Sequence, residues 1–220
     1  MEARAQTEPG QSVVKARHKT FHALKGLAAL GSALLLAACA TAPVTPLRSW
    51  QTRQQELLAV TRWSADGQLA IRSQGHGGQA WWRWKRDGSS QKLTVVGPFG
   101  GTLFAVREEG RRVSLRDAHG HRFTAEGATN LIHRVTGWRI PADDLSYWIL
   151  GSARPGIPER HTVDHRGRLR VLTQAGWTIR FSRYDRYRSI ALPRRLSAVY
   201  DEPGAPEVHL RLVVHRWRIP

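Results

Sequence analysis

Apolar and polar residues alternate along most of the chain, which is the pattern of strands that are buried on one face. After Asp66-Gly67 the alternating runs are short, and they are separated by turn sequences such as Asp87-Gly88 and His119-Gly120. Short runs joined by tight turns predict a meander of about eleven antiparallel strands.

Two stretches follow a helical period instead. Apolar residues recur every three or four positions over residues 47–61, which predicts a helix there. Between residues 126 and 151 the same spacing predicts two more helices, the first ending at Gly137 and the second beginning at Pro141. The apolar face of the last helix consists of Leu145, Trp148 and Ile149.

The numbers of alternating runs and helical stretches predict a mainly β fold with about three helices. A sheet of so many strands in one domain must curl or close on itself. The helical segment between residues 126 and 151 is available to cover one opening of such a sheet.

The beginning of the chain has a different pattern. Several basic residues precede Gly26, and no charged residue occurs between Gly26 and Leu47. The apolar segment 26–38 is too short to cross a bilayer as a helix, and it is typical of an export signal. It ends in Leu36-Ala37-Ala38-Cys39, which closely resembles the bacterial lipobox.

A lipobox implies that the chain is cut before the cysteine, and that several acyl chains are then attached there and give stable anchorage. We therefore expect a signal peptide (1–38), an acylated Cys39 with a tether (39–46) and a single domain (47–220). The lipobox resemblance implies that an Asp after the cysteine would favour the inner membrane, so Ala40 points to the outer membrane. Cys39 is the only cysteine in the chain, and the alternative to its acylation is that it remains a buried or reactive thiol.

The net charge of +17 first suggests nucleic acid. Most of the excess remains after cleavage, because residues 1–38 contain only five basic and two acidic residues. The arginines are spread singly along the alternating runs, and an exported, anchored chain seldom meets nucleic acid. We interpret the charge as a solvated basic face that steers acidic partners or holds the domain near anionic headgroups.

One turn does not have the polar composition that turns usually have. Between two predicted strands, Gly97, Pro98, Phe99 and Gly100 place an aromatic residue at the tip of a loop. Phe99 either folds back and caps the core or protrudes as an apolar tip that enters a bilayer or a partner.

These features together resemble the LolB family of outer-membrane lipoproteins, over essentially the whole chain after the lipobox. The most specific parts are Gly97-Pro98-Phe99-Gly100, Ile140-Pro141, Leu145, Trp148-Ile149-Leu150-Gly151, Gly176-Trp177, Tyr184 and Trp217.

The resemblance implies an open, strongly curved antiparallel sheet, a half-barrel whose helices cover an apolar cavity. Such a cavity takes the acyl chains of client lipoproteins, which arrive on the periplasmic carrier LolA and are inserted into outer-membrane phospholipid. The loop is then a membrane-insertion loop with a bulky apolar tip, where Leu is expected and this chain has Phe99. The resemblance also implies a monomer without a cofactor.

A carrier of acyl chains needs a continuous apolar surface, because each CH2 released into water costs roughly 0.8 kcal/mol. The alternative for apolar residues on strand and helix faces is an ordinary filled core. The candidates for the cavity lining are Trp82, Trp84, Leu93, Val95, Leu145, Trp148, Ile149, Trp177, Ile179 and Phe181.

The sequence offers little support for an enzyme. It contains no Gly-x-Ser-x-Gly motif, and no P-loop follows Gly100-Gly101. His119 with His121, and His161 with His165, could begin a metal site, but both pairs lie beside glycine turns and lack further ligands. A passive lipoprotein that binds another hydrophobic ligand remains an alternative.

The lipobox predicts that Cys39 is acylated after cleavage behind Ala38 and that the protein fractionates with the outer membrane. Mass spectrometry of the mature N-terminus checks this prediction. An unmodified Cys39, or a retained segment 26–38, would contradict it.

Overall fold

One continuous sheet runs through most of the chain. The computed structural model describes residues 49–220. The predicted signal peptide, Cys39 and the tether lie outside the described residues. The strands are β1 (Arg62–Ser73), β2 (His76–Asp87), β3 (Ser90–Val96), β4 (Thr102–Glu109), β5 (Arg112–Asp117), β6 (Arg122–Ala125), β7 (Glu159–Val163), β8 (Leu169–Gln174), β9 (Trp177–Tyr187), β10 (Ile190–Tyr200) and β11 (Val208–Arg218).

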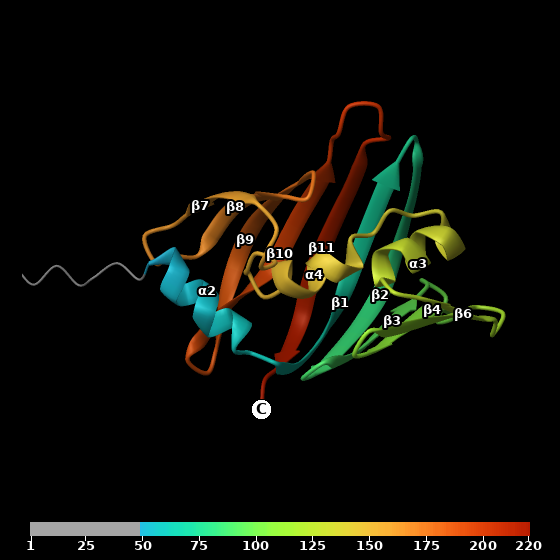
Figure 1. Cartoon of the computed structure of the whole chain (residues 1–220), viewed down its shortest axis with the longest axis horizontal. Coiled ribbons are helices and arrows are strands. Elements are labelled where there is room, and N and C mark those ends of the chain that lie inside the picture. The colour runs from blue at the N-terminus through green and yellow to red at the C-terminus, as the bar shows by residue number, and fades with distance from the viewer. Residues whose placement is uncertain (1–48) are drawn as a thin grey trace, which may run out of the picture. The chain divides into compact units, whose positions relative to one another are not determined.

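The strand order is β6-β5-β4-β3-β2-β1-β11-β10-β9-β8-β7, and every pairing is antiparallel. Two meanders are therefore joined where the first strand pairs with the last (Figure 1). The predicted meander and its strand number are confirmed. The sequence signal is weakest in β10, because Pro193 and two arginines interrupt its alternation.

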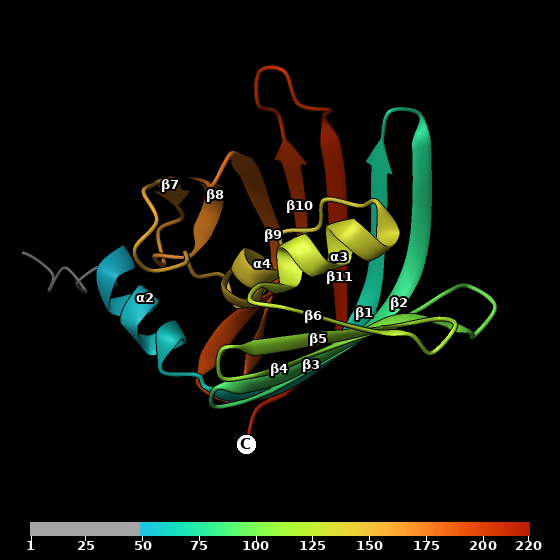
Figure 2. The ribbon, with the colours of Figure 1, turned by 45° about the vertical axis from the view of Figure 1, so that its right-hand side comes forward.

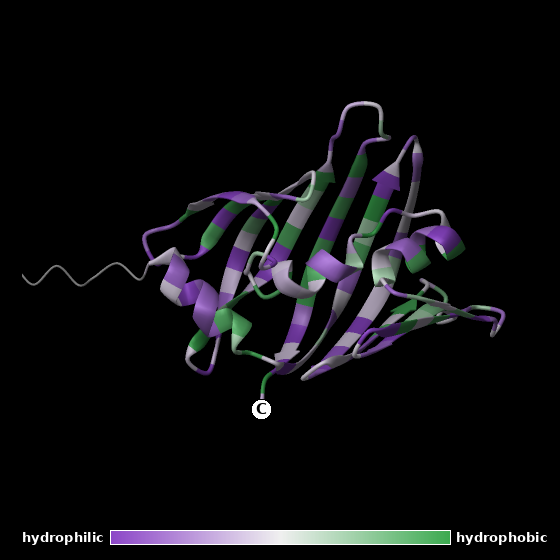
Figure 3. Cartoon of the chain, in the orientation of Figure 1, coloured by the Kyte–Doolittle hydropathy of each residue, from purple (hydrophilic) through white to green (hydrophobic). Residues whose placement is uncertain are grey.

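The sheet curves strongly, so that β3 to β6 turn underneath the helices (Figure 2). Apolar and polar bands alternate along the strands (Figure 3). The apolar bands belong to buried positions such as Ala80, Trp82 and Trp84, whereas the intervening Trp81 and Arg83 are exposed. The predicted open, curved sheet is confirmed, and its concave face is the apolar one.

Within residues 49–220 three helices accompany the sheet, which agrees with the predicted number. They are α2 (Trp50–Leu58), α3 (Ala128–Thr136) and α4 (Ala142–Trp148). The hydroxyl of Ser49 caps α2 by accepting a hydrogen bond from the backbone N–H of Thr52. Gly137 ends α3 in the left-handed conformation, with φ of 75°. Helices α3 and α4 lie over the concave face of the sheet (Figure 2).

The structure corrects the prediction at Asp66-Gly67. This dipeptide does not precede a strand but lies inside β1, where the pairing with β11 shifts register between Asp66 and Gly67. A Cβ atom at Gly67 would lie 1.9 Å from the carbonyl oxygen of Val213 and 2.9 Å from the Trp82 ring. Glycine therefore lets the two central strands approach at a β-bulge, which sequence alternation does not distinguish from a turn.

The buried apolar core consists of residues between Trp50 and Trp217. Residues 46–220 form one compact unit by their own contacts. This domain therefore holds its core without the preceding segment.

We predict that Gly67→Ala destabilises the domain by about 1–3 kcal/mol or more, because the new methyl group collides with backbone that cannot move away easily. Gly78→Ala in β2 is the matched control, since its Cβ atom would meet nothing within 4 Å. Urea unfolding of both variants measures the difference. Equal unfolding free energies would show that the bulge does not require glycine.

Candidate functional site

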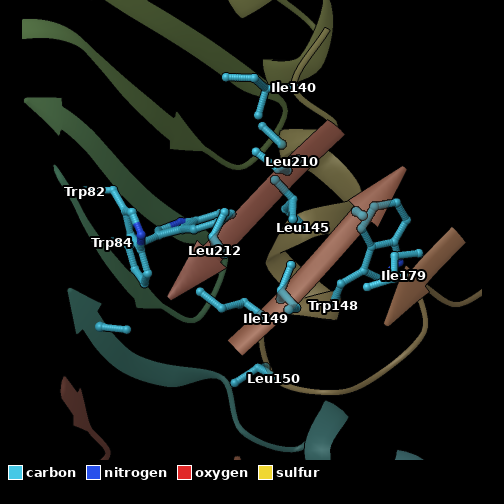
Figure 4. Close-up of a cluster of buried hydrophobic side chains, with 14 of the residues drawn as sticks. Trp82, Trp84, Ile140, Leu145, Trp148, Ile149, Leu150, Ile179, Leu210 and Leu212 are labelled. Carbon is cyan, nitrogen blue, oxygen red and sulfur yellow. The ribbon is translucent and has the colours of Figure 1, made fainter. Parts of the chain in front are cut away.

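The concave face and the segment around α4 enclose an apolar interior. Leu145, Trp148 and Ile149 point toward the sheet, where Leu210, Leu212 and Ile179 lie (Figure 4). Of the ten residues predicted to line a cavity, Leu93 is half-buried and the other nine are buried. The structure thus places seven of the predicted residues on strands of the sheet and three, Leu145, Trp148 and Ile149, on α4 and its C-cap.

This interior is closed. Trp148, Ile149 and Ile179 have no exposed surface, and Trp82 and Trp84 are each 3% exposed. These side chains therefore offer almost no surface to solvent. An acyl chain can reach them only if part of the cover moves.

One small cavity marks where the cover meets the sheet. It has a volume of about 10 Å³ and lies between side chains of β2, β3 and β4 and the first residues of α3 and α4. A space of this size holds about one water molecule at most. Its lining consists of Trp84, Gln91, Leu93, Val106, Glu108, Ala128 and Ala142. We call this contact the seam.

Polar side chains complete the seam. The indole N–H of Trp84 donates to the Gln91 side-chain oxygen at 2.9 Å, and the Gln91 amide donates to Glu108 at 2.7 Å. The seam therefore joins an apolar interior to a polar rim. Sequence alternation identifies Trp84 and Leu93 but gives no sign that Gln91 and Glu108 are bonded to each other.

The other end of α4 is held more firmly. Gln174 is 2% exposed, and its oxygen accepts from the Trp148 indole N–H and from the Arg154 backbone N–H, each at 2.9 Å. Its amide donates to the carbonyl oxygens of Arg154 and Ile157. All hydrogen-bonding capacity of this buried amide is therefore used, which fixes α4 to strand β8.

Helix α2 fastens the same region. Gln54 donates to the Ala153 carbonyl oxygen and accepts from the Ala153 N–H, both at 3.0 Å. Asp144 of α4 pairs with Arg154 at 2.9 Å, and this hydrogen bond raises the pKa of Arg154. Gln54 thus ties the segment that follows α4 to α2, and Arg154 ties the same segment to the first turn of α4.

Asp143 joins α3 to α4. A carboxylate in the first turn ordinarily stabilises its own helix, but Asp143 accepts from the N–H groups of Ala128 and Thr129 at 3.0 and 3.1 Å. It thereby caps α3, whose N-cap residue Gly127 has no side chain for this purpose. The two helices are thus coupled end to end and form one cover.

The loop between β3 and β4 points outward. Phe99 is fully exposed at 101% of its reference surface. Two backbone hydrogen bonds close the loop, from Gly97 N–H to the Gly101 oxygen at 2.8 Å and from Gly100 N–H to the Gly97 oxygen at 3.0 Å. Gly100 has φ of 86°, which glycine adopts without strain. Phe99 therefore protrudes from the domain and does not fold back to cap the core.

The histidine pairs have ordinary partners. His121 contacts Asp117 at 2.9 Å, and His161 contacts Glu159 at 3.2 Å beside the Trp50 ring. Within residues 49–220, no group of three or more His, Cys, Asp or Glu side chains could hold a metal ion.

The domain thus combines a closed apolar interior under a helical cover with an exposed aromatic loop. The family model for "Outer membrane lipoprotein LolB" matches residues 61–217. The chain belongs to the LolB family. It is thus an outer-membrane lipoprotein that takes part in the localisation of lipoproteins.

Named relatives agree with this membership. The LolB protein of Cellvibrio japonicus is 31% identical over 198 residues, which is 88% of this chain and 95% of that protein. The LolB protein of Nitrosococcus oceani is also 31% identical, over 86% of this chain and 95% of its own length.

A solved structure supports the fold. The crystal structure of a LolA superfamily protein from Nitrosomonas europaea superposes with a TM-score of 0.54. That match covers 78% of this chain and 94% of the other, at 10% identity. This chain thus shares the fold of that LolA superfamily protein. None of the helices in residues 49–220 of this LolB-family chain is long and apolar enough to cross a membrane.

Proposed function

We propose that this protein accepts lipoproteins from a LolA-like periplasmic carrier, holds their acyl chains under α3 and α4, and inserts them into the outer membrane. It acts as a monomer anchored through Cys39, without a cofactor and without nucleic acid. The observation that carries the proposal is the position of the cover: two coupled helices close an apolar interior that acyl chains can enter only by moving them.

The seam is the opening in this proposal. Few bonds cross it among the described contacts, whereas Gln174 and Gln54 hold the opposite end of α4. Movement of α3 and the first turn of α4 away from β3 and β4 would expose Trp84, Leu93 and Val106 to an incoming chain. Glu108 and Gln91 would remain at the water-facing rim.

Acyl chains would drive this opening by replacing the contacts that the cover loses. Each CH2 withdrawn from water contributes about 0.8 kcal/mol, so a full chain can offset several lost side-chain contacts. No nucleotide-binding motif supplies energy in the sequence. Transfer therefore runs down an affinity gradient from carrier to this protein and then to the bilayer.

The Phe99 loop would perform the second half of the transfer. A fully exposed aromatic side chain is unfavourable in water and gains free energy at a bilayer interface. Insertion of this tip would bring the loaded domain against the membrane. The competing function, a passive lipoprotein that binds another hydrophobic ligand, needs no such loop.

We predict that Leu93→Glu weakens acyl binding while the domain stays folded. Leu93 lies at the seam and is half-buried, so a carboxylate there can remain partly hydrated in the closed state but would meet an acyl chain in the open one. Affinity for a fluorescent fatty-acyl probe should fall about tenfold or more. Thr94→Glu is the matched control, because this half-buried neighbour on the same strand faces the opposite side.

Circular dichroism checks the fold of both Leu93→Glu and Thr94→Glu. Equal probe affinity in the two variants would place the acyl site away from the seam.

We predict that Phe99→Glu separates acceptance from delivery. The exposed position should keep the unfolding free energy within about 0.5 kcal/mol of the wild type. Acceptance from a loaded carrier should persist, whereas delivery to liposomes should fail because the carboxylate resists burial in lipid. Client lipoprotein should then accumulate in a soluble complex.

Phe99→Leu is the control for the loop, because it keeps an apolar tip and should deliver nearly normally. Normal delivery by folded Phe99→Glu would contradict the insertion step.

A further inference from the structure

The outer face of strands β3 to β6 carries a concentration of positive charge. This face lies on the side of the strands away from α3 (Figure 2). A groove of about 580 Å³ runs over it, and five basic side chains and one acidic side chain, Glu109, contribute to its lining. The basic residues are Lys92, Arg107, Arg112, Arg116 and Arg122.

The strand register places like charges next to one another. Lys92 of β3 stands between Lys85 of β2 and Arg107 of β4, and Arg116 of β5 stands opposite Arg122 of β6. Like charges in directly opposed positions destabilise a sheet. An anion that binds this face would remove that repulsion.

Internal acidic groups balance only part of this charge. Glu109 lies 3.8 Å from Arg107 and is paired in register with Arg112. Within residues 49–220, Lys92, Arg116 and Arg122 have no acidic partner in any ion pair. These three cations therefore remain available to an external anion.

Exposed apolar side chains flank the charge on the side of the Phe99 loop. Trp81 and Leu103 face outward and are each 46% exposed, and Leu103 packs against Gly97 of the loop. In an antiparallel meander the β3–β4 and β5–β6 connections lie at the same end, so Arg116 and Arg122 are near this loop. Indole rings beside basic side chains and an apolar tip are the arrangement of interfacial membrane binding.

We propose that this face, with Lys92, Arg116 and Arg122 at its centre, binds the phosphate groups of anionic lipid headgroups and orients the protein on the bilayer surface. Charge complementarity favours phosphate-bearing headgroups, and the neighbouring Trp81, Leu103 and Phe99 favour a bilayer over an acidic protein as the occupant. The inference rests on the membrane-delivery step proposed above, and it identifies the surface that meets the headgroups.

Vesicle co-sedimentation tests this inference with the domain of residues 46–220, which holds its core by itself and lacks the lipid anchor. The wild type should bind vesicles containing phosphatidylglycerol more tightly than pure phosphatidylcholine vesicles, and added salt should weaken the difference. Lys92→Gln, Arg116→Gln and Arg122→Gln combined should weaken binding to the anionic vesicles about a hundredfold, which corresponds to about fivefold per charge.

The matched control is Arg170→Gln, Arg180→Gln and Arg186→Gln combined. It removes the same charge from exposed positions of β8 and β9, at the other end of the sheet. Anionic-vesicle binding by this control should stay within about twofold of the wild type. Equal losses in the two triple variants would overturn the inference, because binding would then follow net charge and not this face.

If the Lys92, Arg116 and Arg122 variant binds vesicles normally but loses affinity for the carrier, the face binds an acidic protein and the inference is wrong. If vesicle binding depends on this face but a loaded carrier transfers nothing to the wild type, the inference holds and the proposed function fails. Thermal unfolding verifies that both triple variants are folded.

Discussion

The packing of α4 against the concave face of the sheet is the contact on which the rest of the structure depends. An eleven-stranded sheet that curves this far has a concave apolar surface too large to leave in water. Trp148 covers the centre of that surface with its ring and uses its indole N–H to bond Gln174. Without this cover, the aromatic residues of β2 and β9 would be exposed and prone to association.

The cover is fastened unequally, and this asymmetry suggests how it works. At and just beyond the C-terminal end of α4, Gln174 and Gln54 supply many hydrogen bonds, whereas the Asp144–Arg154 pair holds the first turn of the helix. At the seam, small residues such as Ala128 and Ala142 meet β2 to β4 around a small cavity. In the proposed function the cover opens at the seam, and α3 moves with α4 because Asp143 accepts from the N–H groups of Ala128 and Thr129 while its own N–H donates to the Thr129 hydroxyl. The Phe99 loop belongs to the β3–β4 hairpin, whose strands also form the sheet side of the seam.

Much of the fold could be predicted from alternation, because a strand buried on one face must repeat every two residues. The outward position of Phe99 could be offered only as one of two interpretations, since nothing in a glycine-rich turn decides whether its tip folds back. The bulge at Gly67 was missed, because Asp-Gly has the same composition in a turn as in a bulge. The roles of Gln174 and Asp143 depend on partners 26 and 15 residues away in the chain, which no local pattern specifies. The closed state of the interior depends on side-chain packing in three dimensions, for which strand and helix periodicity gives no measure.

The central claim is that acyl chains of client lipoproteins lie between the sheet and the α3–α4 cover. Photo-crosslinking tests it most directly, with a client whose acyl chain carries a diazirine and is passed from a loaded LolA-like carrier to this protein. Peptide mapping by mass spectrometry should find cross-links at residues of the seam and interior, such as Trp84, Leu93, Leu145 and Ile149. Cross-links confined to Phe99 or to outward-facing residues such as Trp81 would contradict the account, because the acyl chain would then travel over the surface of the domain and never enter it.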